Sequence, residues 1–236
     1  MIKQYKFKNV FSNNKSLFTK NLVPNSQVYN EKLVMQEGIE YREWNPRRSK
    51  LGAMILNGCK IMPIKEDSKV LYLGAGSGTT ASHISDIANK GIVYCIEFSG
   101  RAFLKLLKVC RKRKNMFPLL YDANQIEKYQ SIVKDVDVVY QDIAQKEQTK
   151  IFLKNLVFLK KEGFGIFMVK ARSIDVKIEP KLIYKEIIKE LKSDELEVLE
   201  SINLEPYERD HIAIIIQKKS NEKAFLLHFN NSLCIQ

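Results

Sequence analysis

The stretch from Val70 to Thr80, VLYLGAGSGTT, places three glycines in five positions directly after a run of apolar residues. The whole chain has only 10 glycines in 236 residues. Such a stretch predicts a buried strand, an abrupt turn and the start of a helix, because glycine lets the backbone turn sharply and approach a ligand closely. The start of the helix also offers free backbone N–H groups to a ligand, as in nucleotide-binding sites. We therefore expect a ligand to lie against this glycine-rich turn.

The spacing of these glycines distinguishes between classes of nucleotide site. A dinucleotide fold has the pattern G-x-G-x-x-G, and here Thr79 breaks that pattern. A phosphate loop of the Walker type needs a Lys after the glycines, and none follows. G-x-G-x-G after a first strand is typical of S-adenosylmethionine methyltransferases. A methyltransferase is therefore favoured, and a dinucleotide oxidoreductase is a distant alternative.

Strand-like and helix-like runs alternate along most of the chain. The predicted strands are 69–75, 91–98, 116–123, 136–144, 163–171, 196–204 and 211–217, and the predicted helices are 47–59, 79–88, 100–114, 147–159 and 179–191. This alternation predicts an α/β, Rossmann-like domain of parallel βαβ units with helices on both faces of the sheet. Residues 1–45 contain short segments broken by turn residues and predict a small β-rich N-terminal domain. We expect the larger domain to span 46–218 and a tail to span 219–236.

Three carboxylates follow three successive predicted strands, namely Glu97, Asp122 and Asp142. Ligands of such sheets bind at the carboxyl ends of the strands. Glu97 is placed to accept hydrogen bonds from both ribose hydroxyls, and Asp122 to accept one from the adenine amino group. Asp142 would face the charged amine of the ligand or the reacting centre. Acidic residues also end strands simply as loop starters, but three together behind a glycine-rich turn favour a ligand site.

The charge balance points to a polyanionic partner. The 39 Lys and Arg exceed the 27 Asp and Glu by 12, and the pI is about 9.4, which favours nucleic acid over a Lys-rich composition without function. The run 108–114 could grip RNA phosphates, act as a nuclear localisation signal or merely favour a helix end. No apolar run reaches the roughly 18–20 residues of a membrane span, so no membrane partner is expected. Four scattered cysteines and three histidines predict no metal site.

Several longer motifs occur together and in order: NPRRSKL, VLYLGAGSGTTASHISDI, VYCIEFS, DVVYQDIAQKEQT, VKARSID and LEPYERDH. From about residue 21 to about residue 217 the chain resembles fibrillarin, the rRNA ribose 2′-O-methyltransferase of box C/D ribonucleoproteins. The resemblance implies a class I S-adenosylmethionine-dependent methyltransferase domain and a role in pre-rRNA processing. The implied cofactor-binding residues are Gly74, Gly76, Thr79, Thr80, Glu97, Phe98, Asp122, Ala123, Asp142, Ile143, Ala144 and Gln145.

The resemblance also implies a reactive set of Lys50, Asp142, Lys170 and His211. A ribose 2′-hydroxyl is a weak acid, so catalysis consists mainly of alignment and proton handling. Lys170 would act as the base, Asp142 would orient it, and Lys50 would supply a second positive charge. His211 would position the substrate.

Each of these residues also has an ordinary structural alternative, such as a lysine extending from a strand end to solvent. Glu205, Glu208 or Asp210 could fill the fourth place instead of His211. Arg47, Arg48 and Arg172 are candidates for contacts to RNA phosphates.

No segment resembles an RNA-reading module, so target choice must come from outside the chain. The resemblance implies a box C/D guide RNA paired to rRNA, a Nop-family scaffold protein and a kink-turn-binding protein. Gly38 is the only glycine among the first 50 residues, so the Gly/Arg-rich region of eukaryotic fibrillarins has no counterpart there. We expect a nucleolus-like site in the nucleus, with an archaeal-type cytoplasmic location as the alternative. A methyltransferase for a base or a small molecule, and a scaffold without catalysis, remain the competing functions.

Overall fold

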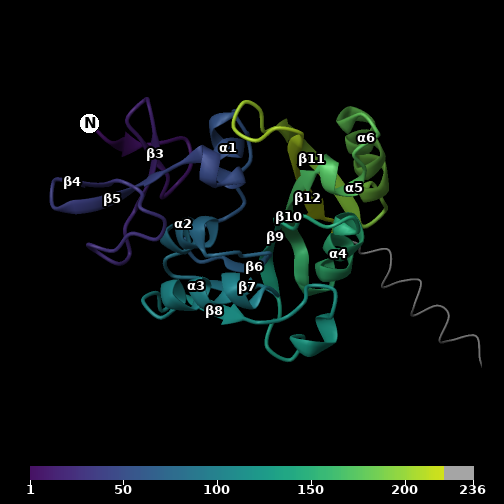
Figure 1. Cartoon of the computed structure of the whole chain (residues 1–236), viewed down its shortest axis with the longest axis horizontal. Helices are drawn as coiled ribbons and strands as arrows, with labels where there is room; N and C mark the ends of the chain where they lie inside the picture. Colours follow the sequence, from purple (N-terminus) through teal and green to yellow (C-terminus); the bar gives the residue numbers. More distant parts are fainter. Residues whose placement is uncertain (221–236) are drawn as a thin grey trace, which may run out of the picture.

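The computed structural model describes residues 1–220, which form two sheets and the helices packed on them (Figure 1). The larger sheet has seven strands in the order β11-β12-β10-β9-β6-β7-β8. Its strands are β6 (Lys69–Leu73), β7 (Ile92–Ile96), β8 (Met116–Leu119), β9 (Val136–Gln141), β10 (Leu159–Lys170), β11 (Leu196–Asn203) and β12 (His211–Lys218). Most of the tail predicted at 219–236 lies outside the described residues.

Five strands of this sheet, β6 to β10, pair in parallel, while β12 runs antiparallel to both β10 and β11. The short connection from β11 to β12 contains no crossover helix, and a parallel pair needs one. The predicted α/β class is therefore confirmed, with an antiparallel exception at one edge. The parallel core strands are buried on both faces, as their continuous apolar runs predict.

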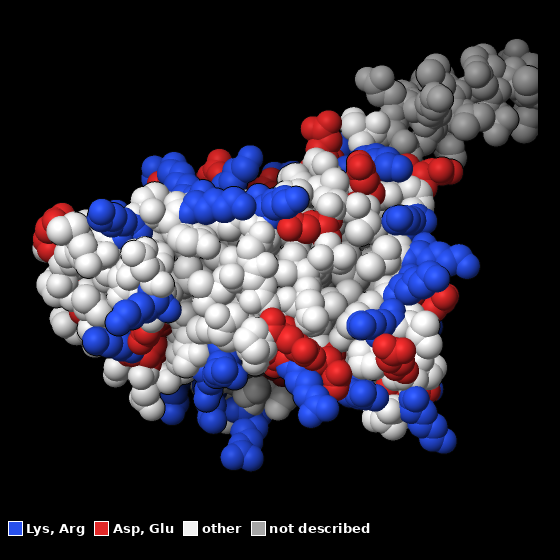
Figure 2. All heavy atoms as spheres, turned by 90° about the horizontal axis from the view of Figure 1, so that it is seen from above, with Lys and Arg blue, Asp and Glu red and all other residues white. Residues whose placement is uncertain are grey.

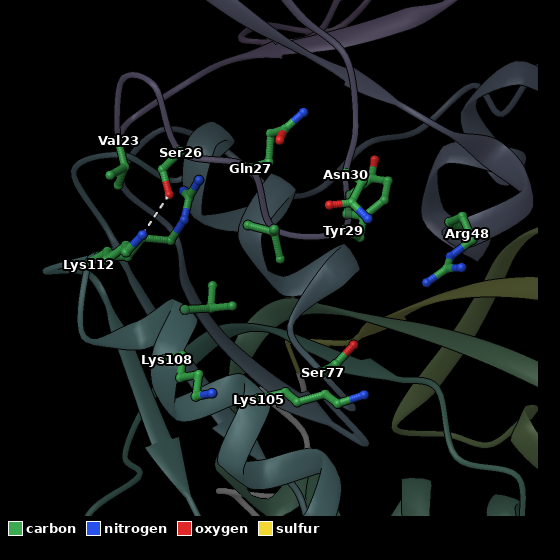
Figure 3. A pocket seen from close by; sticks show the side chains of 13 residues that line it. Val23, Ser26, Gln27, Tyr29, Asn30, Arg48, Ser77, Lys105, Lys108 and Lys112 are labelled. Carbon is green, nitrogen blue, oxygen red and sulfur yellow. Dashed lines mark hydrogen bonds between the residues drawn. The ribbon is translucent and has the colours of Figure 1, made fainter.

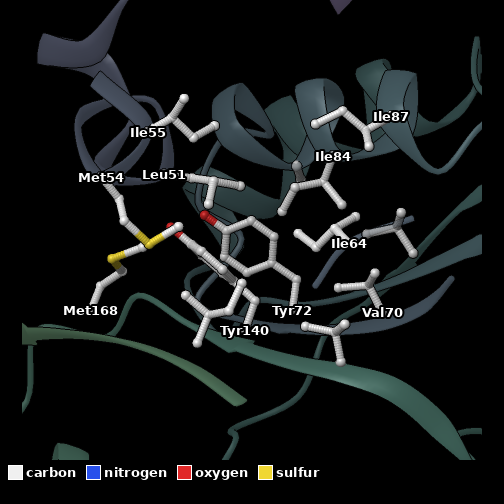
Figure 4. Close-up of a cluster of buried hydrophobic side chains, with 14 of the residues drawn as sticks. Leu51, Met54, Ile55, Ile64, Val70, Tyr72, Ile84, Ile87, Tyr140 and Met168 are labelled. Atoms are coloured by element: carbon white, nitrogen blue, oxygen red, sulfur yellow. The ribbon is translucent and has the colours of Figure 1, made fainter. Parts of the chain in front are cut away.

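Helices cover both faces of the larger sheet. They are α1 (Lys50–Leu56), α2 (Thr79–Ile87), α3 (Gly100–Cys110), α4 (Gln148–Asn155), α5 (Ala171–Ile174) and α6 (Pro180–Leu191), with 3₁₀ turns η1 (Pro46–Arg48), η2 (Ile126–Lys128) and η3 (Leu156–Phe158). Helices α1 and α2 pack on one face around Tyr72, Tyr140 and Met168, as Figure 4 shows. Helices α4 and α6 pack on the other face. The alternating side chains of each strand supply both cores.

The smaller sheet contains β1 (Lys3–Gln4), β2 (Phe11–Ser12), β3 (Leu17–Lys20), β4 (Leu33–Gln36) and β5 (Ile39–Trp44), all paired antiparallel. A buried ionic network joins it to α2. Arg42 contacts Glu31 at 2.6 Å and Asp86 at 2.9 Å, and Asp86 also pairs with Arg113 at 2.6 Å. These side chains are almost completely buried, so each charge depends on its partners.

His83 of α2 completes the contact between the sheets. Its ring stacks on Trp44 with the centroids 4.8 Å apart, and its two nitrogens lie 2.8 Å from the hydroxyls of Thr19 and Tyr29. Complete burial lowers the pKa of His83 well below its usual value, and the Arg42 charge lowers it further. This histidine is therefore neutral and structural. Among the described residues, no helix is long and apolar enough to cross a membrane.

Candidate active site

The glycine-rich turn after β6 has the geometry that its sequence predicts. Gly74 has a φ of +79°, and a Cβ there would lie 2.5 Å from the carbonyl oxygen of Asp142. Gly76 has a φ of +56° and donates its N–H to Glu97 Oε2 at 2.8 Å. Gly78 has a φ of +91° and is the N-cap of α2. Both the positive φ values and the close backbone approach therefore require glycine in this turn.

A cavity of about 360 Å³ lies at the carboxyl ends of β6, β7, β8 and β9. Every residue of the predicted cofactor set except Thr79 and Thr80 lines it: Gly74, Gly76, Glu97, Phe98, Asp122, Ala123, Asp142, Ile143, Ala144 and Gln145. Ile96 and Tyr121 also line it and were not predicted. Each directly precedes one of the predicted carboxylates, which is the signal that could have identified them.

The acidic side chains of this cavity are held by local hydrogen bonds. Glu97 is only 6% exposed, and its two oxygens accept from the N–H groups of Gly76 and Ser99, each at 2.8 Å. Asp122 Oδ1 accepts from the N–H of Asn124 at 2.8 Å. The backbone therefore fixes both carboxylates at the sheet edge before any ligand arrives, and their remaining acceptor capacity is available to hydroxyl or amino donors.

Thr79 and Thr80 do not line the cavity, and their contact with the ligand stays a prediction. The Thr80 hydroxyl is buried and donates to Ser49 Oγ at 3.0 Å. The Thr79 carbonyl accepts from the Ser82 hydroxyl at 2.8 Å. Both residues form the first turn of α2, and the hydroxyl of Thr80 joins that helix to the N-cap of α1.

The predicted reactive residues meet beside this cavity. Lys50 Nζ lies 2.6 Å from Asp142 Oδ1, and both side chains are about one-fifth exposed. Lys170 and His211 are direct partners in the β10–β12 pairing, so their side chains leave the same face of the sheet. Asp142 therefore belongs both to the cavity and to the reactive group.

Asp142 has a different lysine partner from the one that the sequence analysis gives it. Asp142 pairs with Lys50, whereas no ion pair joins it to Lys170 in the part of the chain that the structure describes. Lys50 is the first residue of α1, and the start of this helix brings its side chain to the residue that directly follows β9. Spacing in the sequence could predict the common edge but not which lysine reaches the carboxylate.

Gln148 was missed by the sequence analysis and holds Lys170 in place. The Gln148 side chain is fully buried; its Oε1 accepts from the Lys170 N–H at 2.9 Å and its Nε2 donates to the Lys170 carbonyl at 3.0 Å. The same Nε2 donates to the Gln145 carbonyl at 3.0 Å. Gln148 thus ties the end of β10 to the loop that lines the cavity. No signal in the sequence points to this role, because α4 (QTKIFLKN) begins with several polar residues and Gln148 does not stand out among them.

His211 is nearly buried, at 7% exposure, and its Nδ1 donates to the Arg209 carbonyl at 2.6 Å. Burial lowers the pKa of His211 below its usual value; the Lys50 charge acts in the same direction, against the hydrogen bond to Arg209. A neutral imidazole near Lys50 suits a role in positioning the substrate. Of the three acidic alternatives to His211, Asp210 is already paired with Arg172 at 3.0 Å.

The three predicted RNA contacts lie in different surroundings. Arg47 lies over the Tyr207 ring at 5.8 Å, and its Nη1 is 3.4 Å from the Pro206 carbonyl. Arg172 pairs with Asp210 and also donates to the Val176 carbonyl at 2.7 Å. Arg48 is exposed and lines a separate groove. Arg47 and Arg172 are therefore partly engaged by the protein itself.

Comparison with known proteins identifies the family. The profile of the Fibrillarin family matches residues 1–220. The fibrillarin-like rRNA/tRNA 2′-O-methyltransferase of Methanothermobacter thermautotrophicus is 50% identical over 210 residues, which cover 89% of this chain and 94% of that protein. This chain belongs to the fibrillarin family. The resemblance seen in the sequence motifs is thereby confirmed.

Two solved structures of the family are similar over most of their length. Aeropyrum pernix fibrillarin with natively bound S-adenosyl-L-methionine has a TM-score of 0.84 and 43% identity, covering 92% of this chain and 97% of that one. A fibrillarin in complex with Nop5p has a TM-score of 0.82 and 45% identity, covering 89% of this chain and 98% of that one. Family members thus include one that binds this cofactor and one that assembles with a Nop protein.

Proposed function

We propose that this chain transfers a methyl group from S-adenosylmethionine to ribose 2′-hydroxyls of rRNA, within a ribonucleoprotein directed by a box C/D guide RNA. The observation that carries the proposal is the dual place of Asp142, which lines the cavity and pairs with Lys50 at 2.6 Å. A methyl donor in the cavity would lie next to the reactive lysines. The relatives named for both rRNA and tRNA extend the substrate class to tRNA riboses.

The cavity suits S-adenosylmethionine in its donor set. Gly74 and Gly76 leave room against the backbone, Glu97 can accept from the ribose hydroxyls, and Asp122 can accept from the adenine amino group. Asp142 can face the charged amine of the methionine part. When bound, the cofactor supplies an activated methyl group on a sulfonium.

The residues of the chain then handle the proton of the ribose hydroxyl. The Lys50 ammonium is engaged by Asp142, whereas no described residue forms an ion pair with Lys170. We assign Lys170 as the base that accepts the 2′-hydroxyl proton while the oxygen takes the methyl group. His211, on the strand beside Lys170, positions the ribose. Gln148 fixes the backbone from which Lys170 extends.

The same geometry weighs against the competing functions. An RNA-binding scaffold without catalysis would not need Lys50, Asp142, Lys170 and His211 at one edge. The loop after β9 carries QDIAQ, and a base-targeting enzyme would more naturally show an Asn-Pro-Pro-Tyr-like motif or a catalytic Cys. A dinucleotide oxidoreductase remains disfavoured by Thr79. The ribose hydroxyl is the acceptor that a lysine base beside the cavity fits best.

Target choice would come from the guide, because phosphate contacts carry no sequence information. We infer a Nop-family scaffold, which docks on the methyltransferase domain, and a kink-turn-binding protein as partners. We take residues 46–218 as that domain and 1–45 as the unit that supports it. The protein would act where its RNA substrate is made, which is a nucleolus-like compartment or, in an archaeal-type cell, the cytoplasm.

The guide dependence is testable with purified components. Protein, S-adenosylmethionine and target RNA alone should give negligible methylation. Addition of the scaffold, the kink-turn-binding protein and a matching guide should give methylation at one nucleotide, and a changed guide should move it. Efficient, site-specific methylation by the protein alone would contradict the proposal and favour a stand-alone ribose methyltransferase.

A further inference from the structure

A second hollow, of about 440 Å³, lies between residues 23–30 and helix α3. Figure 3 shows Ser26, Gln27 and Asn30 on one wall and Lys105, Lys108 and Lys112 on the other, and we call this hollow the α3 groove. Its remaining lining residues are Val23, Val28, Tyr29, Arg48, Ser77, Val109 and Arg113. No acidic residue of the described chain lines it. The α3 groove is therefore a recess with positive and neutral polar walls.

Lys105 and Lys108 lie three residues apart on one side of α3, and Lys112 lies in the turn that follows the last residue of the helix, Cys110. All three are exposed, and neither they nor Arg48 takes part in an ion pair with a described residue. Lys112 Nζ only donates to Ser26 Oγ, at 3.2 Å. The lysines are spread over about 10 Å along α3 and the turn after it, the length of roughly three phosphates along one strand.

Arg113, in the same basic run, behaves differently. It is 4% exposed and its guanidinium pairs with Asp86 at 2.6 Å. The basic run predicted from the sequence thus divides in two: Arg113 is committed to the buried ionic network, while Lys112 faces the groove. Apart from Arg113, the positive side chains that line the α3 groove take no part in ion pairs with described residues.

Two of the residues that line the groove lie next in the chain to residues of the active site. Arg48 stands two residues before Lys50, and Ser77 lies between Gly76 and Gly78 of the cofactor turn. In Figure 3, Arg48 and Ser77 mark one end of the groove and Lys112 the other. A polymer lying along α3 would therefore arrive at the turn that borders the reactive residues.

We propose that the α3 groove binds the phosphate backbone of the RNA whose ribose is methylated. This inference rests on the proposed function, since it assumes that the acceptor is RNA. Lys and Arg side chains also surround much of the face shown in Figure 2, so the groove belongs to a broadly positive molecule. A recessed, polar groove that leads to the site fits a strand of nucleic acid better than a flat lipid surface. Its phosphate contacts fix orientation and leave sequence choice to the guide.

The test compares two triple variants of the full chain. The groove variant carries Lys105→Gln, Lys108→Gln and Lys112→Gln. The control variant carries Lys69→Gln, Lys134→Gln and Lys161→Gln, three exposed lysines at or near the amino ends of β6, β9 and β10. Both lose the same charge, and thermal unfolding checks that both remain folded.

The readout is the fluorescence anisotropy of a labelled RNA duplex of arbitrary sequence over a salt series. The groove variant should bind at least tenfold more weakly at low salt, and its slope of log affinity against log salt should fall by about 2 to 3. The control variant should bind almost as the unchanged chain does. Equal binding by the groove variant and the unchanged chain would overturn the proposal, as would an equal loss in the control.

The same variants separate the alternatives. If the groove variant loses binding to anionic phospholipid vesicles but keeps its RNA affinity, the groove serves a lipid surface and the proposal fails. The binding assay needs no methyl transfer, so its failure leaves the proposed function intact. Conversely, groove-dependent RNA binding without methylation in the full assembly would overturn the function and leave the RNA groove standing.

Discussion

Replacement of Gln148 by leucine tests whether Lys170 depends on its support. The substitution removes three side-chain hydrogen bonds, two to the Lys170 backbone and one to the Gln145 carbonyl. At about 1 kcal/mol for each bond, we expect a loss of about 3 kcal/mol of folding stability. We also expect the methyl-transfer rate to fall at least tenfold, because a small misplacement of a catalytic group costs rate steeply. Affinity for S-adenosylmethionine should change far less.

A matched control separates positioning from simple destabilisation. Asn115 also makes three side-chain hydrogen bonds, with Ser85 and Ala88, but lies at the opposite edge of the sheet. Asn115→Leu should destabilise the protein similarly and leave the rate nearly unchanged at a temperature where both variants are folded. Single-turnover methylation in the assembled ribonucleoprotein gives the rate, and urea unfolding gives the stability. Equal rates for the two variants would refute the positioning role of Gln148. Should Gln148→Leu fail to fold, Gln148→Met removes the same three hydrogen bonds with the unbranched shape retained.

Three further predictions concern the cofactor site, the ionic network and His83. Glu97→Ala should weaken S-adenosylmethionine binding by about 2 kcal/mol, or about thirtyfold, in calorimetry; unchanged affinity would remove Glu97 from the site. Arg42→Met should cost about 3 to 5 kcal/mol in urea unfolding, because it leaves Glu31 and Asp86 buried with too few partners; a loss below about 1 kcal/mol would contradict the network. His83 has a lowered pKa in the folded protein, so its unfolded form binds more protons below about pH 6.5 and stability falls as pH drops. Unfolding at pH 5.5 should therefore need about 1 kcal/mol less than at pH 7.5, and a flat profile would exclude a neutral buried His83.

Much of the site could be predicted because backbone geometry determines it. Gly74 must be glycine where the chain passes the Asp142 carbonyl, and a run of apolar residues buried on both faces marks β6. The carboxyl ends of parallel strands meet at one edge, which brought Glu97 and Asp122 into one cavity. The starts of the predicted helices and the limits of the predicted strands agree with those of the structure within a few residues.

Side-chain partners chosen by tertiary packing could not be predicted. The approach of α1 decides that Lys50, rather than Lys170, reaches Asp142. Arg113 reads as part of an exposed basic run, yet Asp86 draws it into the core. The hydroxyl of Thr80 binds that of Ser49, which lies 31 residues earlier in the chain. Each of these outcomes depends on residues far away in the sequence, where local patterns carry no information.

The central claim is tested most directly by removing the ribose 2′-hydroxyl that is proposed to accept the methyl group. Two target RNAs should be compared in the complete assembly, identical except that one carries a 2′-deoxyribose at the nucleotide addressed by the guide. Mass spectrometry of the isolated fragment measures whether a methyl group is added there. We predict methylation of the ribose target and none of the deoxy target, with loss of the reaction in Lys170→Ala. Equal methylation of both targets would show that a base is the acceptor and would contradict the account.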